Sequence, residues 1–317
     1  MLSRVADALY WMGRSLERAE NATRLLLVTE DLSAELGGLH RDLAAAEWQD
    51  LLAVFPGSVV VGGDGPPALA HLHAFLKDAG NPYSVASSLR RARDNARSAR
   101  EALTLEVFLN LNEAHRELDA RGRRELRDLP SVRSVLSATQ KAVLSIVGAI
   151  DHTLSRDQSW LFLKLGESLE RAFRTAFVLR AKLPALLGSE ARGRRVDVEL
   201  QYTRCRGLLR AVSSLENYRQ AHGARLEPTD VVRFLLFDPD APRALRHGTA
   251  AVRDHLERMV GSNGLTPPLR LVSKLLARLA YDAEEVVVDR DTLAFLDHAL
   301  AELAKTHDAI AAEYFTS

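Results

Sequence analysis

The chain has 317 residues, of which 47% are hydrophobic and 26% charged, as in an ordinary globular protein. Its 42 Lys and Arg residues equal its 42 Asp and Glu residues, which argues against a protein dedicated to binding nucleic acid or acidic membranes. A single cysteine, Cys205, excludes a framework of internal disulfides. Because no apolar run is long enough to cross a membrane and no secretory signal is evident, we expect a cytoplasmic protein.

Apolar residues recur at helical spacing along most of the chain, which predicts an all-α protein. The helix after the N-cap Ser84 is expected to continue through Val107, and a charged segment at 116–128 separates it from the next helix. The β-branched run at 58–61 has no partner strand and is expected to be a loop. The other predicted helices cover 2–35, 40–55, 68–77, 130–154, 156–183, 197–222, 228–236, 242–262, 267–285 and 290–314. The fold class is therefore a large helical bundle of about ten to twelve helices.

Two of the predicted helices share a motif. The segment Gly13-Arg14-Ser15-Leu16-Glu17-Arg18-Ala19 returns as Gly166-Glu167-Ser168-Leu169-Glu170-Arg171-Ala172, 153 positions later (166 − 13 and 171 − 18). A weaker likeness relates the regions after Pro82 and Pro242, at an offset of 160 (242 − 82). We therefore expect a single domain, 1–317, built from two duplicated halves, 1–153 and 154–317, that are related by a pseudo-twofold axis.

Both motif helices combine apolar residues all round with charged ones. Such helices are usually buried, and a buried charge is costly unless it is paired. Because Glu17 and Arg18 are adjacent, they point in different directions, so each is expected to reach another helix or a ligand. Glu20 can pair with Arg24 one turn away. Either the two Glu-Arg pairs fix the register of the bundle as structural ion pairs, or the two copies approach each other and form a polar pocket.

The helix after Ser84 carries three arginines beside its apolar stripe. Arg93, Arg97 and Arg100 are spaced four and three residues apart and therefore line one side of the helix. This side is either a solvated face with local salt bridges, or a set of guanidinium groups that bind an anion or the acidic groups of the repeated motif.

No familiar catalytic or metal-binding motif is present. The ten histidines show no zinc-ligand spacing, and no base or oxyanion motif accompanies Cys205, so we expect neither a metal nor a cofactor, and the catalytic residues remain unknown. Glu17 and Glu170 could form an acid/base couple or a carboxylate metal pair, but the Glu-x-x-His spacing usual for metal sites in helical bundles is absent from these helices.

Several further segments, together with the first motif, carry a resemblance to a known family. They are Met1 to Arg4, Trp11 to Asn21, Asn81-Pro82-x-Ser84, Ala92 to Arg97, Leu111-Asn112, Trp160 to Gly166, Leu169-Glu170-Arg171, Glu216-x-Tyr218-Arg219, Phe234 to Leu236 and Pro242-Arg243. With these segments the chain resembles the bacterial alpha-E domain family, which is described as all-helical with a characteristic Glu-Arg motif. Phe108 stands where the family pattern has Trp, and Ala244 where it has Ser.

The resemblance implies partners rather than an activity. Family members look like partners of ATP-grasp-type peptide ligases and transglutaminase-like proteins. We therefore expect a non-catalytic accessory protein that binds or presents a peptide or carboxylate substrate. The alternatives are an enzyme of unrecognised type with a Glu/Arg site between the repeats, and a structural module that forms homo-oligomers through an exposed apolar patch. The candidate binding residues are Arg14, Glu17, Arg18, Glu20, Asn21, Arg93, Asn95, Arg97, Glu170 and Arg171.

Overall fold

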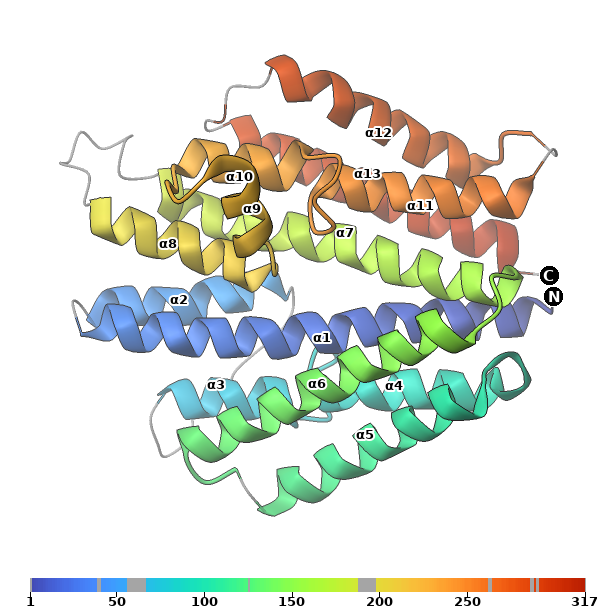
Figure 1. The fold of residues 1–317 in the computed structure, drawn as a ribbon, viewed down its shortest axis with the longest axis horizontal. Coiled ribbons are helices and arrows are strands. Elements are labelled where there is room, and N and C mark those ends of the chain that lie inside the picture. The colour runs from blue at the N-terminus through green and yellow to red at the C-terminus, as the bar shows by residue number, and fades with distance from the viewer. Residues whose placement is uncertain are drawn as a thin grey trace.

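The computed structural model describes residues 2–38, 41–55, 67–124, 126–187, 198–261, 264–285, 288 and 291–316. These residues form thirteen α-helices and one 3-10 turn, and none of them lies in a strand, which confirms the all-α helical bundle. Two long helices, α1 (Ser3–Gly37) and α7 (Gln158–Leu187), run side by side through the middle of the molecule (Figure 1). Most of their side chains are buried, because other helices cover them on both sides.

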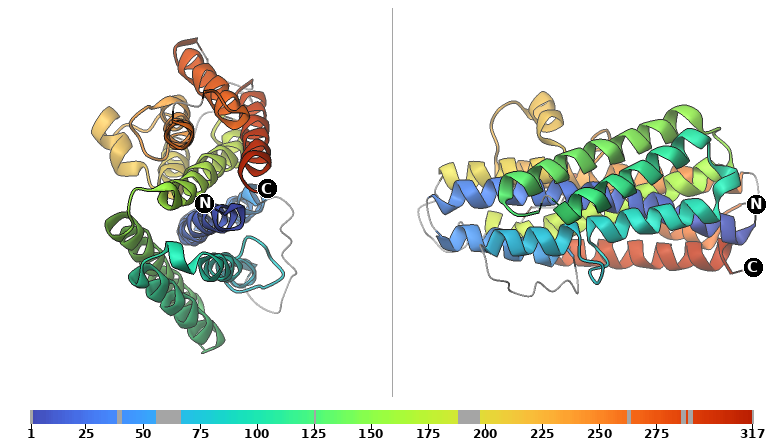
Figure 2. Two further views of the ribbon diagram at one scale, coloured as in Figure 1. Left: turned by 90° about the vertical axis from the view of Figure 1, so that its right-hand side faces the viewer. Right: turned by 90° about the horizontal axis from the view of Figure 1, so that it is seen from below.

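The remaining helices surround this central pair. Between α1 and α7 the chain forms α2 (Arg41–Val54), α3 (Pro67–Leu76), α4 (Val85–Ser98), η1 (Arg100–Ala102), α5 (Leu105–Arg124) and α6 (Leu129–Thr153). After α7 it forms α8 (Val198–Ala211), α9 (Leu215–His222), α10 (Pro228–Phe237), α11 (Leu245–Val260), α12 (Pro267–Glu285) and α13 (Asp291–Tyr314). Helices α2 and α8 each contact both α1 and α7. Helix α4 packs on α1 as α11 packs on α7, and the pairs α5/α6 and α12/α13 form the outer layers (Figures 1 and 2).

Two segments that periodicity predicts as single helices are each divided in two, which gives thirteen α-helices in the described residues. The helix predicted through Val107 ends at Ser98, and α5 then runs to Arg124 through most of the charged segment at 116–128. Leu103 has an extended backbone yet remains buried, so the apolar spacing continues although the chain turns. The helix predicted over 197–222 divides into α8 and α9 at Ser213, which has φ of +55°. The run at 58–61 lies outside the described residues.

Two short turns bring loop residues to the central helices. In the first turn the Ser84 N–H donates to the Asn81 carbonyl at 3.1 Å, and in the second the Ala244 N–H donates to the Ala241 carbonyl at 2.9 Å. The Ser84 hydroxyl accepts from the Ser87 N–H at 3.1 Å, which confirms the predicted N-cap of α4. Ala244 has the same extended backbone at the start of α11 but offers no capping side chain.

None of the helices in the described ranges combines the length and the apolarity that crossing a membrane requires.

Candidate functional site

Helices α1 and α7 come into backbone contact at the two motif glycines. A Cβ atom on Gly13 would lie 2.0 Å from the carbonyl oxygen of Leu163, and one on Gly166 would lie 2.0 Å from that of Tyr10. Each glycine therefore faces the carbonyl three residues before the other glycine. Only glycine permits this approach, and it brings the charged residues that follow in each motif within reach of the opposite helix.

Glu170 lies one turn beyond this contact and is completely buried. Its Oε2 accepts from Nε of Arg14 at 2.8 Å, and its two oxygens accept from Nε and Nη2 of Arg18 at 2.8 and 2.9 Å. Nε of Arg174 lies 3.2 Å from Oε1. Burial alone would raise the pKa of Glu170, but the charges of the three arginines outweigh it and hold the pKa well below its usual range.

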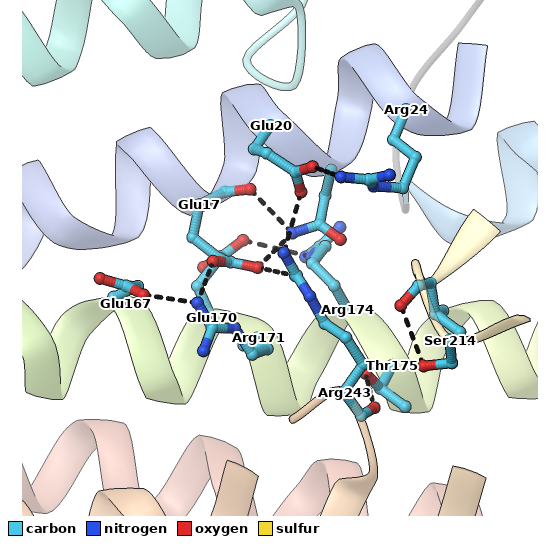
Figure 3. Close-up of polar contacts among 12 residues, drawn as sticks. Glu17, Glu20, Arg24, Glu167, Glu170, Arg171, Arg174, Thr175, Ser214 and Arg243 are labelled. Carbon is cyan, nitrogen blue, oxygen red and sulfur yellow. Dashed lines mark hydrogen bonds and ion pairs between the residues drawn. The ribbon is translucent and has the colours of Figure 1, made fainter. Parts of the chain in front are cut away.

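Glu17 has a corresponding set of partners on the other side of the contact. Its Oε2 accepts from Nη2 of Arg171 at 2.9 Å, and its Oε1 accepts from Nδ2 of Asn21 at 2.6 Å and from Nη1 of Arg243. Figure 3 shows the side chains of Glu17, Arg171 and Arg243 meeting between α1 and α7. Burial raises the pKa of Glu17, but Arg171 and Arg243 lower it by more, to about 2.

The two motifs exchange their ion pairs reciprocally. Glu17 of the first motif pairs with Arg171 of the second, and Glu170 of the second pairs with Arg18 of the first. The expectation that the adjacent Glu and Arg side chains reach partners on another helix is thus confirmed. Glu20 also pairs with Arg24, as its spacing predicts, and it extends the cluster through a second ion pair with Arg243 at 3.1 Å.

The candidate residues derived from the sequence lack Arg174, Glu167 and Arg243, which also belong to this cluster. Arg174 lies four residues after Glu170, and Glu167 lies four residues before Arg171, so a search for helical neighbours could have found both. No local signal identifies Arg243, because it reaches α1 from the turn before α11. That turn is held against α7, where the Thr175 hydroxyl donates to the Arg243 carbonyl at 2.9 Å.

The structure brings seven of the ten candidate residues together, and the three on α4 lie apart from them. Nε of Arg93 donates to Oδ1 of Asn112 at 2.8 Å, which ties α4 to α5. Asn95 is half-buried, and Arg97 is exposed on the last turn of α4, where it lines a cavity. The arginine row of α4 is therefore not a partner of the Glu-Arg motifs.

Aromatic rings cover the guanidinium groups of the cluster. The guanidinium of Arg14 lies 4.8 Å from the centre of the Trp11 ring, that of Arg18 lies 5.4 Å from Tyr83, and that of Arg174 lies 5.0 Å from Phe177. Such contacts favour cations that have lost their water. The cluster is thus a buried set of ion pairs between two helices, in which Glu17 and Glu170, with their lowered pKa values, accept hydrogen bonds from several sides.

Known proteins resemble this chain over most of its length. It is 25% identical over 319 aligned residues to uncharacterized protein Mb2597 of Mycobacterium bovis, and equally so to uncharacterized protein MT2643 of Mycobacterium tuberculosis. Each alignment covers 90% of this chain and 34% of the relative, so the chain spans about a third of the length of these relatives. No solved structure matches the chain. The model of the Alpha-E family, described as a predicted alpha-helical domain with a conserved ER motif, matches residues 1–315, and the chain therefore belongs to the Alpha-E family.

Proposed function

We propose that this Alpha-E protein is a non-catalytic accessory partner of an ATP-grasp-type ligase and a transglutaminase-like protein, for which it holds a peptide or another carboxylate. One observation carries the non-catalytic part: the charged residues of the two motifs pair with each other. Glu17 and Glu170 are both buried and both bound by arginines of the opposite helix. The motif thus serves to lock α1 against α7, and recognition of partners falls to the surface.

The enzyme alternative places an acid/base couple at Glu17 and Glu170. A general acid or base works best when its pKa lies near the operating pH. The pKa values of both carboxyls are lowered, Glu17 to about 2, so neither holds a proton to give at neutral pH. Their low basicity makes them poor proton acceptors as well. These properties favour a binding protein over an enzyme that uses this pair.

The two halves, 1–153 and 154–317, are proposed to descend from one duplicated unit. The reciprocal glycine contacts and the exchanged Glu-Arg pairs support this proposal, because a twofold relation makes residue i meet j wherever j meets i. The matching turns before α4 and α11 add to it.

Co-purification tests the proposed partnership. The full chain would be expressed with an affinity tag beside the ATP-grasp-type ligase and the transglutaminase-like protein from the same genome, and each pair would be analysed by sedimentation velocity. We expect a defined complex with at least one of them at micromolar concentration. Absence of any complex with both proteins at about 10 μM, roughly −7 kcal/mol of binding free energy, would contradict the proposal.

A structural oligomeric module remains a second candidate because apolar side chains are exposed on the outer helix pair. Leu105 and Leu109, one turn apart on α5, are 60% and 53% exposed, and Leu144 on α6 is 48% exposed. Light scattering on the purified chain would measure its mass. A dimer that dissociates when Leu109→Glu is introduced would support this candidate, and a monomer at all concentrations would exclude it.

A further inference from the structure

A cavity of about 740 Å³ opens at one end of the bundle, remote from the Glu-Arg cluster. It lies where α1 and α7 begin and where α4 and α6 end, and the left view of Figure 2 looks onto this end of the molecule. Its volume falls within the range of about 300–1,000 Å³ that is typical of small-molecule sites. The residues around it come from both halves of the sequence, since Ser155 to Ser159 lead into α7.

Three arginines from three different elements line this cavity. Arg4 comes from the first turn of α1, Arg97 from the last turn of α4, and Arg100 from η1. Among the described residues, no carboxylate lies within ion-pair distance of any of the three. Arg100 is nevertheless held in place, because its Nη1 donates to the Leu103 carbonyl at 3.1 Å and its guanidinium lies 4.6 Å from the centre of the Phe108 ring.

Two acidic residues, Asp157 and Glu101, also line the cavity, so the formal charge of its lining is +1 (three arginines less two carboxylates). Asp157 caps α7, where its Oδ1 accepts from the backbone N–H of Ser159 at 2.9 Å and of Trp160 at 3.2 Å. Glu101 is exposed to solvent. This arrangement is the opposite of the α1–α7 cluster, where every arginine is opposite a carboxylate. Unpaired positive charge inside a cavity attracts anions.

Neutral hydrogen-bonding groups and an apolar margin complete the lining. Hydroxyl groups line the cavity at Ser98, Thr104, Thr153 and Ser155. The Ser98 and Thr153 hydroxyls donate to the carbonyls of Asp94 and Ala149 at 3.2 and 2.7 Å, so these two are not donors for a ligand. The Thr104 and Thr153 hydroxyls lie 2.8 Å apart and join the segment before α5 to the end of α6. Leu2 and Leu154 provide apolar surface beside these polar groups. The cavity can therefore hold both a charged group and a small uncharged organic part.

We propose that this cavity binds a small phosphate ester. A phosphate monoester carries nearly two negative charges and three acceptor oxygens, so it needs donors from several directions. The donors at this cavity are guanidinium groups from three elements, α1, α4 and η1. A carboxylate has two acceptor oxygens in one plane, whereas the three oxygens of a phosphate point in different directions and suit guanidinium groups that come from three elements. This inference is independent of any association with a ligase.

Calorimetric titration of the full chain at low ionic strength tests the proposal, with phenyl phosphate, inorganic phosphate and citrate as probes. We expect phenyl phosphate to bind one site with a Kd below about 1 mM, more tightly than inorganic phosphate because the apolar margin is also covered. Arg97→Ala and Arg4→Ala should each weaken binding at least about tenfold, since each removes charge-assisted hydrogen bonds. Both side chains are exposed, so these variants should keep the helical circular dichroism of the parent.

A matched control is available on a distant helix. Arg270 is an exposed arginine near the start of α12, and Arg270→Ala changes the net charge by the same amount without touching the cavity. We expect it to leave the affinity unchanged within about twofold. The proposal is overturned if no phosphate probe saturates a site by about 10 mM, if citrate binds at least tenfold more tightly than phenyl phosphate, or if Arg97→Ala weakens binding no more than the control does.

Discussion

The Glu17→Gln variant tests whether the buried Glu-Arg cluster between α1 and α7 stabilises the fold through its ion pairs. Glutamine keeps the size and shape of the side chain and one carbonyl oxygen, but it is neutral and adds an NH₂ group that donates. That group would face guanidinium groups of Arg171 or Arg243, which also donate. Those two arginines, with side chains 22% and 15% exposed, would keep only Glu167 and Glu20 as carboxylate partners. Removing one partner of a buried ion pair is strongly destabilising.

The pKa of Glu17 gives the expected magnitude. It falls from the ordinary 4.5 to about 2 in the folded protein, and at about 1.4 kcal/mol per unit this corresponds to roughly 3 kcal/mol. Because the folded-state pKa is the lower one, this stability is present above pH 4.5 and is lost as the pH falls toward about 2. We expect Glu17→Gln to lower the free energy of unfolding by about 3 kcal/mol near neutral pH, and the deficit to shrink as the pH falls through that window.

Urea unfolding followed by circular dichroism at several pH values would measure both effects. Glu216→Gln is the matched control, since the Glu216 side chain is 75% exposed and its ion pair with Arg219 spans 3.3 Å. We expect it to change the free energy of unfolding by less than about 0.5 kcal/mol. If Glu17→Gln proved as mild as this control near neutral pH, the cluster would not stabilise the fold through charge, and the structural interpretation of the motif would fail.

Three further changes test the packing, the capping and the titration of this fold. Gly166→Ala should lower the free energy of unfolding in urea by at least about 3 kcal/mol, because the new Cβ would lie 2.0 Å from a main-chain oxygen of α1. Gly148→Ala on α6, where no atom lies within 4 Å of the new Cβ, should raise it by about 0.5–1 kcal/mol. Ala244→Ser should raise the free energy of unfolding by about 1 kcal/mol, because it supplies the N-cap that Ser84 supplies to α4; an unchanged urea midpoint would speak against the cap. Burial lowers the pKa of His255 to about 4, so its neutral form contributes stability that is lost as the pH falls from 6.5 toward 4. Urea midpoints of His255→Gln should therefore vary less with pH across that window than those of the parent.

The sequence predicts the helices and the motif well because both leave local patterns. Apolar spacing of three and four residues identifies most helix bounds, and the adjacent Glu17 and Arg18 on an apolar helix require partners elsewhere. The division between α4 and α5 leaves no such pattern. Ala99, Leu103 and Val107 keep helical spacing and stay buried while the backbone between them turns. Apolar periodicity shows which residues are buried. Here the residues stay buried at helical spacing although the chain changes direction between them.

The sequence also cannot say which arginines meet which carboxylates when the partners lie far apart. Arg243 joins Glu17 and Glu20 across more than two hundred residues, whereas Arg93 and Arg97, which the sequence places beside the core stripe, turn away from the cluster. The reason is geometric: α4 packs on α1, but its arginine row faces α5 and the end of the bundle. A helical wheel shows on which side of its helix a residue lies, but it does not show which other helix packs against that side.

Arg18 and Arg97 differ in whether they are free to bind a ligand in this protein. Arg18 is buried and gives two of its donors to Glu170, so an incoming anion would first have to displace that carboxylate from a dry site. Arg97 is exposed at a cavity with two further arginines and forms no ion pair among the described residues, so it can bind an anion without breaking an existing pair. In this chain the Glu-Arg motif joins α1 to α7 through buried ion pairs, and the arginines without ion pairs at the end of the bundle are the ones that we propose bind a ligand.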